Sequence, residues 1–226
     1  MTAETITQRV KDLLASLPPG VRLVAAAKSR TAREVREAVE AGITDIGHNY
    51  VQEAEGMRQS LGESAARVCW RLIGRLQHNK ARKAVRLFDA IDAVDSARIA
   101  QAIDRHGAEI GKVMPVLVEV NSGREPNKTG AMPEAVERLI REIAPFGHVR
   151  VQGLMTMGPY DEDVGRVRPF FRLTKQLFDR IAAARIPNVE MRFLSMGMSR
   201  SYLVAIEEGA NVVRIGTKLF GERAPE

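Results

Sequence analysis

The sequence lacks the features that mark several large classes of protein. It has one cysteine, Cys69, so an internal disulfide cannot form and a reducing compartment is expected. No apolar run approaches the roughly 20 residues that a membrane-spanning helix needs. The first residues, Met1 to Thr5, do not have the basic and then apolar layout of a secretory signal. We therefore expect a cytoplasmic protein that makes no use of a membrane.

Aromatic residues are scarce as well, at 5% of the chain. That leaves little surface on which nucleic-acid bases could stack. The net charge of +6 favours anionic partners, but charges of both signs alternate along the chain, as in residues 33–37. We expect no specific binding of nucleic acid, although an adaptor that uses a basic face stays an alternative.

Sequence signatures of several common sites are also missing. The four histidines have no metal-ligand spacing and no Cys-x-x-Cys pair exists, so a metal site is not expected. Neither a dinucleotide-binding G-x-G-x-x-G nor a P-loop follows the first apolar segment. Ser195 is not in a G-x-S-x-G pattern, which argues against a serine nucleophile.

What the sequence does contain is a regular alternation of short apolar segments and amphipathic ones. After an amino-terminal helix at about 4–17, eight segments are typical of buried strands: 21–27, 43–47, 70–74, 88–94, 113–120, 149–157, 189–194 and 212–215. Thr31 and Glu34 form the sequence pattern of a capping box at the start of one intervening helix. The alternation predicts an α/β protein, a single (β/α)8 barrel of the TIM type over residues 1–226, with an open doubly wound sheet as the alternative.

Polar residues follow the predicted strands, at the end of a barrel where active sites lie. The loops after the seventh and eighth strands contain Ser195 with Gly197, and Gly216 with Thr217. Many barrels bind phosphate at these two loops through backbone N–H groups and hydroxyls. The two clusters together favour a phosphate site, although each alone is typical of a turn. Further polar residues at the strand ends include Lys28, His48, Asn49, Arg75, Asn121 and Arg214.

Lys28 follows the apolar run 24–27, which has three alanines and places the lysine amine over the barrel opening. A desolvated lysine at such a place holds its proton less tightly and becomes a nucleophile toward carbonyl groups. The small neighbours leave room for a flat ring. An amine beside a phosphate site indicates either pyridoxal phosphate chemistry or a class I aldolase.

Six stretches of this chain together resemble the pyridoxal phosphate homeostasis proteins. The likeness runs from about residue 21 to residue 221. Its motifs are VAAAK at 24–28, NYVQE at 49–53, IGRLQHNK at 73–80, GLMTM at 153–157, LSMGMS at 194–199 and RIGTKLFG at 214–221. The resemblance implies a barrel like the amino-terminal domain of bacterial alanine racemase, with pyridoxal 5'-phosphate as the cofactor.

The resemblance also implies roles for individual residues. Lys28 is expected to carry the cofactor as an internal aldimine. The remaining cofactor contacts are expected from Ser195, Gly216 and Thr217 at the phosphate, from the main chain of Met196 and Gly197, from Arg214 near the pyridine nitrogen, and from Asn49 and Met155 near the ring. Two positions depart from the usual pattern: His48 stands where an acidic residue is common, and Arg75 replaces a frequent histidine.

We expect a carrier that buffers or delivers pyridoxal phosphate and has no catalytic site of its own. An arginine beside the pyridine nitrogen leaves that nitrogen unprotonated and weakens the ring as an electron sink. The 226 residues also leave no room for the second domain that completes alanine racemase. The expected partners are the cofactor and pyridoxal phosphate-dependent apoenzymes, and the expected state is a monomer. The alternative is a minimal racemase-like enzyme acting on amino acids.

Overall fold

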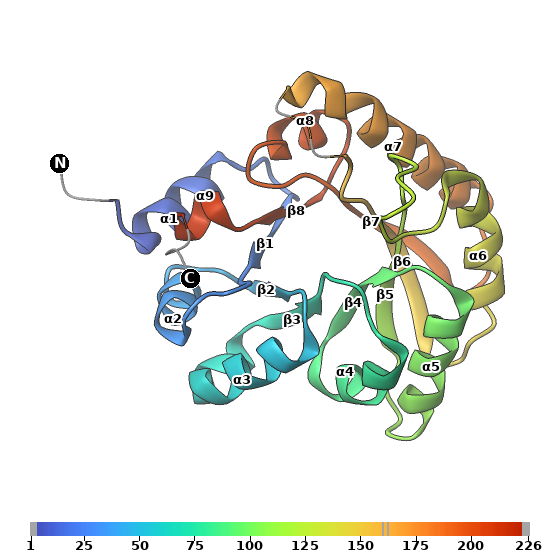
Figure 1. Ribbon diagram of the computed structural model, residues 1–226, viewed down its shortest axis with the longest axis horizontal. Coiled ribbons are helices and arrows are strands. Elements are labelled where there is room, and N and C mark those ends of the chain that lie inside the picture. The colour runs from blue at the N-terminus through green and yellow to red at the C-terminus, as the bar shows by residue number, and fades with distance from the viewer. Residues whose placement is uncertain (1–3, 160, 162, 223–226) are drawn as a thin grey trace.

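The eight predicted strands form one closed parallel barrel, so the predicted fold class is confirmed. The computed structural model describes residues 4–159, 161 and 163–222. The strands pair in chain order and the last strand closes on the first. Figure 1 shows the strands at the centre with helices around them. The strands are β1 (Arg22–Ala26), β2 (Asp45–His48), β3 (Cys69–Leu72), β4 (Ala90–Val94), β5 (Met114–Glu119), β6 (Val149–Met155), β7 (Val189–Ser195) and β8 (Val212–Ile215).

The helices alternate with the strands and cover the outside of the barrel. They are α1 (Ile6–Ser16), α2 (Ala32–Glu40), α3 (Val51–Leu61), α4 (Ala81–Leu87), α5 (Ala97–Ala108), α6 (Val136–Ile143), α7 (Arg168–Ala183), α8 (Tyr202–Glu207) and α9 (Thr217–Phe220). Short 3₁₀ segments lie at Gly62–Arg67, His78–Lys80, Pro133–Ala135 and Val164–Val167. The first helix lies beside α2 and α9 (Figure 1). Within the described part of the chain, no helix has both the length and the apolar character needed to cross a membrane.

Local sequence signals account for where helices begin. The Thr31 hydroxyl accepts a hydrogen bond from the Glu34 N–H at 3.3 Å, and the Glu34 carboxylate accepts one from the Thr31 N–H at 2.7 Å. This is the predicted capping box, and it satisfies two backbone donors at the start of α2. At the start of α1, the Thr5 hydroxyl accepts from the Gln8 N–H at 3.2 Å.

The apolar side chains form two layers on either side of the strands. The larger layer lies between the strands and the helices and includes Trp70, Phe88 and Phe171. The smaller layer fills the barrel interior, where side chains of alternate residues meet. Its members form two clusters, one of Val24, Ile73 and Val212 and one of Ala93, Leu117 and Met155, and Phe193 packs against both.

The strands β6 and β7 approach each other unusually closely at Gly153. This residue has φ of +147°, and a Cβ added there would lie 1.8 Å from the Phe193 carbonyl oxygen. The β6–β7 register shifts at the same point, between Val151 and Gly153. Only glycine fits this approach, because any other residue would overlap the neighbouring backbone.

Charged side chains fill the barrel interior toward the amino ends of the strands. The Arg71 guanidinium donates two hydrogen bonds of 2.8 Å to the Asp92 carboxylate and lies 3.4 Å from an Asp45 oxygen. Arg22 approaches the same Asp45 oxygen at 3.7 Å. We call Arg22, Asp45, Arg71 and Asp92 the floor cluster. Burial opposes the charge on Arg71, but the charges around it, those of Asp92 and Asp45 among them, and the hydrogen bonds to Asp92 together outweigh burial and raise its pKa.

Candidate functional site

The carboxyl ends of the strands and the loops after them form the mouth of the barrel, and Lys28 lies there. Strand β1 ends at Ala26, and the next N–H, that of Ala27, still pairs with the Gly47 carbonyl at 2.9 Å. Lys28 is half-buried, and its Nζ lies 5.9 Å from the centroid of the Tyr50 ring. The short apolar strand therefore delivers one amine to the mouth, against an aromatic face.

The loops after β7 and β8 are joined to each other. The Arg214 N–H donates to the Gly197 carbonyl at 3.0 Å, and the Lys218 N–H donates to the Ser199 hydroxyl at 3.3 Å. The two segments that the sequence predicts as a phosphate site are thus brought together. Ser199 is a member of this arrangement that the sequence reasoning did not select, although its LSMGMS motif was noted.

The loop after β8 also contacts the end of β1, next to Lys28. A Cβ added to Gly216 would lie 3.2 Å from the Ala26 carbonyl oxygen. Gly216 is half-buried and Thr217 is exposed. In the β1–β2 register, Ala26 is opposite Gly47, so Lys28 comes two residues later on one side and Asn49 on the other. Lys28 therefore follows a strand that lies between the strand leading to Asn49 and the strand leading to the Gly216–Thr217 segment.

The predicted residues of the loop after β7 lie deeper than those after β8. Ser195, Met196 and Gly197 are all buried. Met196 belongs to the layer between strands and helices, not to the barrel interior. The Ser195 hydroxyl accepts a hydrogen bond of 2.8 Å from an Arg214 Nη. In this arrangement the Ser195 side chain holds Arg214, and its predicted phosphate contact stays a prediction.

Arg214 is a buried cation in the mouth. Besides Ser195, its guanidinium donates to the Thr156 carbonyl at 2.8 Å and lies 3.6 Å from the Met157 sulfur. Burial lowers the pKa of Arg214 to about 10, while the charges of Asp92 and Glu119 act in the opposite direction. A guanidinium offers donors only, so this group can stabilise a lone pair or an anion but cannot accept a proton from a ligand.

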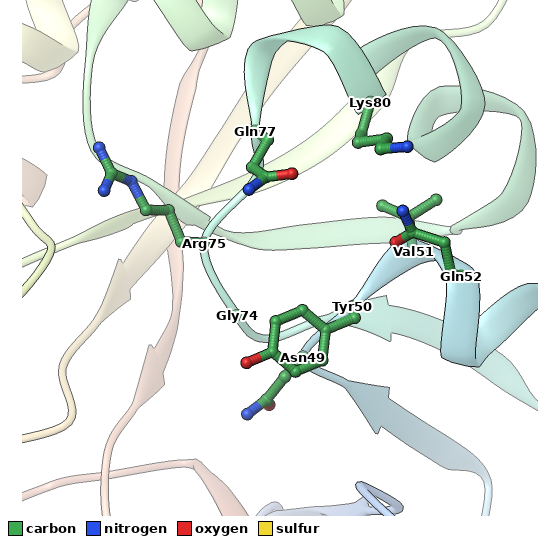
Figure 2. A pocket seen from close by; sticks show the side chains of 8 residues that line it. All are labelled: Asn49, Tyr50, Val51, Gln52, Gly74, Arg75, Gln77 and Lys80. Atoms are coloured by element: carbon green, nitrogen blue, oxygen red, sulfur yellow. The ribbon is translucent and has the colours of Figure 1, made fainter.

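The predicted ring contacts, Asn49 and Met155, lie in different surroundings. Met155 is completely buried in the barrel interior beside Leu117. Asn49 lines an open pocket of about 260 Å³ beside the mouth. Figure 2 shows that its walls come from the segments after β2 and β3. The lining residues are Asn49, Tyr50, Val51, Gln52, Gly74, Arg75, Gln77 and Lys80.

Glu119 is a mouth residue that the sequence reasoning missed. It ends β5 and is 5% exposed. One carboxyl oxygen accepts a hydrogen bond of 2.8 Å from the Thr129 hydroxyl. Burial raises the pKa of Glu119 above its ordinary value, against the lowering effects of Thr129, Arg214 and Arg75. The signal that could have found it is a carboxyl group at the end of an otherwise apolar strand.

His48 ends β2, as predicted, but its ring does not face the mouth. Its ring lies on the outer side of the barrel, stacked on Trp70 with 5.7 Å between the ring centroids. Burial lowers the pKa of His48 to about 4, so the ring is neutral. Arg75, the other departure from the family pattern, is exposed, and its Nε lies 3.7 Å from an Asp95 oxygen.

Metal binding finds no support in the arrangement of ligating side chains. Among the described residues, no group of three or more histidine, cysteine, aspartate or glutamate side chains could hold a metal ion. The thiol of Cys69 is half-buried, and burial raises its pKa to about 11. A thiol that keeps its proton is a poor ligand and a poor nucleophile.

The closed barrel and the lysine at its mouth define a protein of the alanine racemase N-terminal type. The family model described as "Alanine racemase, N-terminal domain" matches residues 2–224. A solved alanine racemase from Clostridium difficile has the same fold, with a TM-score of 0.76 at 17% identity over 98% of this chain and 59% of the racemase.

Proteins with higher sequence identity to this chain show to which family of this fold it belongs. A protein of Aquifex aeolicus named pyridoxal phosphate homeostasis protein is 39% identical over 89% of this chain and 87% of its own length. A protein of Synechocystis with the same name is 35% identical over 94% and 96%. The structure of PipY from Synechococcus elongatus with pyridoxal phosphate bound matches at a TM-score of 0.89 and 34% identity, over 96% of this chain and 100% of PipY. The chain belongs to the pyridoxal phosphate homeostasis protein family.

Proposed function

We propose that this protein binds pyridoxal 5'-phosphate at the barrel mouth and holds it for buffering or delivery, with no reaction of its own. The observation that carries the proposal is the position of Lys28 at the barrel mouth, after the strand that lies between those leading to Asn49 and to the Gly216–Thr217 segment. The name shared by the relatives and the cofactor bound in PipY support it.

The residues at the mouth fit the chemical groups of this cofactor. Lys28 supplies the amine for the aldehyde, and the Tyr50 face 5.9 Å away orients that amine. The joined loops after β7 and β8 supply hydroxyls and backbone N–H groups for the phosphate, with Gly216 leaving the space that a Cβ would fill near Ala26. Ser195, Met196 and Gly197 are the deeper part of the proposed cofactor set.

Holding the cofactor without reaction follows from what the residues can do with protons. When bound, pyridoxal phosphate supplies an aldehyde that condenses with amines and a ring that withdraws electrons. Arg214 has donors only, so a ring nitrogen beside it gains a hydrogen bond but no proton. The ring is then a weaker electron sink, which favours retention of the cofactor over catalysis.

We extend the proposal to partners and location. Acceptors are pyridoxal phosphate-dependent apoenzymes that take the cofactor from the open mouth, and the working state is a monomer in the cytoplasm. The single cysteine suits a reducing compartment. Transfer from loaded protein to an apoenzyme, faster than the cofactor's spontaneous release, supports the delivery part, and a rate equal to spontaneous release contradicts it. Light scattering of the purified chain tests the monomer.

The test of cofactor binding is the visible absorption of the purified protein before and after borohydride, with the modified peptide mapped by mass spectrometry. We expect an absorption band that borohydride bleaches and an adduct on Lys28. Lys28→Ala should lose the band and the adduct, while weak noncovalent binding through the phosphate loops remains.

Lys80→Ala is the matched control, because Lys80 also lines the pocket beside the mouth. This variant should keep both the band and the adduct. An unchanged band in Lys28→Ala, or wild-type protein that stays colourless in added pyridoxal phosphate, would overturn the assignment. Exchange of the α-proton of alanine in deuterated water, abolished by Lys28→Ala, would instead favour the racemase-like alternative.

A further inference from the structure

The carboxyl group of Glu119 is only half satisfied by the protein. Its Oε1 accepts the 2.8 Å hydrogen bond from the Thr129 hydroxyl. Its Oε2 is buried, and among the described residues it has no hydrogen-bond partner. Buried polar atoms nearly always have a partner, because leaving one unpaired costs free energy. An unpaired oxygen at this position therefore points to a ligand.

The alternation of β5 directs this group toward the inside of the barrel. Leu117 packs in the interior beside Ala93 and Met155. Side chains two residues apart on a strand face the same side, so Glu119 also faces inward. Since Glu119 is the last residue of β5, its carboxyl group lies at the mouth and not at the floor.

The loop after β5 fixes the orientation of the carboxyl group. Its end pairs with its beginning: the Ala131 N–H donates to the Glu119 carbonyl at 2.8 Å, and the Asn121 N–H donates to the Ala131 carbonyl at 2.9 Å. This folded loop brings the Thr129 hydroxyl onto Oε1. One oxygen is thereby anchored and the other is left for the mouth.

The charges around Glu119 come from several elements and partly cancel. Arg214 on β8 and Arg75 after β3 favour the carboxylate, as does the Thr129 hydrogen bond. Asp95 after β4 disfavours it, and burial, the largest effect, disfavours it further. On β6, the residue opposite Glu119 is the apolar Met155. The balance raises the pKa of Glu119, so the group keeps its proton to a higher pH than an exposed glutamate.

We propose that Glu119 donates a hydrogen bond from Oε2 to the ring oxygen of pyridoxal phosphate, with the carboxyl group protonated. This inference rests on the proposed function. In that cofactor the ring oxygen and the phosphate arm flank the aldehyde on opposite sides. With the aldehyde at Lys28 and the phosphate at the loops after β7 and β8, the ring oxygen would face away from those loops, toward the side of the barrel formed by β2 to β5, and Glu119 ends β5.

The test is the affinity for pyridoxal phosphate as a function of pH in wild type and three variants. Wild-type affinity should fall as pH rises through the pKa of Glu119, because the donated proton is lost. Glu119→Gln, which always has a donor, should bind like wild type at low pH and lack this fall. Glu119→Ala should bind roughly tenfold more weakly at low pH, because a hydrogen bond to a charged oxygen is lost.

Thr129→Val separates a ligand contact from a structural role. The Thr129 hydrogen bond lowers the pKa of Glu119, so its removal should move the loss of affinity to higher pH without weakening binding at low pH. A loop that merely supported the site would weaken binding at every pH. Infrared spectra of the ligand-free protein give a second measure: a protonated carboxyl band is expected in wild type and absent in Glu119→Gln.

The possible failures are distinguishable. Equal affinities and equal pH profiles in all four proteins would overturn the role of Glu119 and leave the proposed function standing. Glu119→Gln as weak as Glu119→Ala, or no protonated carboxyl band, would show that the group acts as an anion and would overturn the inference. Wild-type protein that binds no pyridoxal phosphate would overturn the proposed function itself. Circular dichroism of each variant establishes that it is folded.

Discussion

Toward the amino ends of the strands the Arg71 guanidinium is held by carboxylates, whereas toward the carboxyl ends the Arg214 guanidinium is held by a hydroxyl and a carbonyl. Arg71 donates two 2.8 Å hydrogen bonds to Asp92. Arg214 donates to Ser195 and to the Thr156 carbonyl, each at 2.8 Å. The pKa of Arg71 is accordingly raised and that of Arg214 is lowered to about 10.

The same barrel thus pairs its charges at one end and leaves them unmatched at the other. Buried ion pairs with complete hydrogen bonding hold a structure in one arrangement, while unmatched buried groups destabilise it until a ligand completes them. Glu119, with one free oxygen, belongs to the second kind. Such a division separates the part of the molecule that maintains the fold from the part that binds.

The largest effect is expected at the floor cluster. Arg71→Ala leaves Asp92 buried without its partner and should lower the free energy of unfolding by about 3–5 kcal/mol, measured by denaturant titration. Arg150→Ala, which removes an exposed ion pair with Glu190, is the control and should cost less than about 1 kcal/mol. Equal losses in the two variants would contradict the importance given to the floor.

His48 provides a third environment, a buried polar ring that faces neither the floor nor the mouth. Its pKa falls from 6.5 in the unfolded chain to about 4 in the folded protein, so the unfolded chain takes up the proton first. Stability is therefore complete above pH 6.5 and declines as the pH falls toward 4, by roughly 3 kcal/mol from this residue.

The variant His48→Phe should remove the part of the acid-induced loss of stability that comes from His48. Among the described residues neither ring nitrogen has a hydrogen-bond partner, the nearest Glu53 oxygen being 3.9 Å from Nδ1, so phenylalanine keeps the stacking on Trp70 and loses no hydrogen bond. Denaturant titrations from pH 4 to pH 7 measure the effect, with His78→Phe at an exposed position as the control. An identical acid decline in wild type and His48→Phe would be inconsistent with a neutral buried ring.

The smallest change in the free energy of unfolding is expected at Arg214. It is useful for comparing the two ends of the barrel because its sign is opposite to that expected for Arg71→Ala. Arg214→Met removes a buried charge that has no close carboxylate partner within the described residues, so the free energy of unfolding should stay unchanged or rise by about 1–2 kcal/mol. Cofactor affinity should fall in the same variant. A loss of stability as large as that of Arg71→Ala would mean that the mouth, too, is built for stability.

The sequence allowed the barrel to be predicted because its signals are local. Each strand lies within or beside its predicted segment, and the Thr31–Glu34 capping box has both of its hydrogen bonds. Turn residues and apolar periodicity depend only on neighbours a few residues away, so they can be recognised in the sequence without knowledge of the fold. The strand ends moved by a few residues, and the four-residue helix α9 was not predicted.

The direction of side chains at the strand ends was harder to predict. Strands of a parallel barrel are apolar on both faces, so the sequence does not tell which alternate residues point inward. His48 ends β2, as predicted, but its ring faces the helices, and Glu119 was overlooked within an apolar strand. The hydrogen bond between Ser195 and Arg214 depends on the pairing of β7 with β8, which the sequence pattern of either segment alone does not reveal.

The floor cluster determines the order in which the donor and the acceptor of the cofactor can bind. Because Asp45, Arg71 and Asp92 fill the interior at the amino ends of the strands, the proposed cofactor enters and leaves by the same end. A donor that loads the protein and an acceptor that empties it then compete for one opening. Delivery then takes place in two separate binding events, because the donor must dissociate before the acceptor can bind. Its steady-state kinetics should be of the ping-pong type, with parallel lines in double-reciprocal plots of rate against partner concentration.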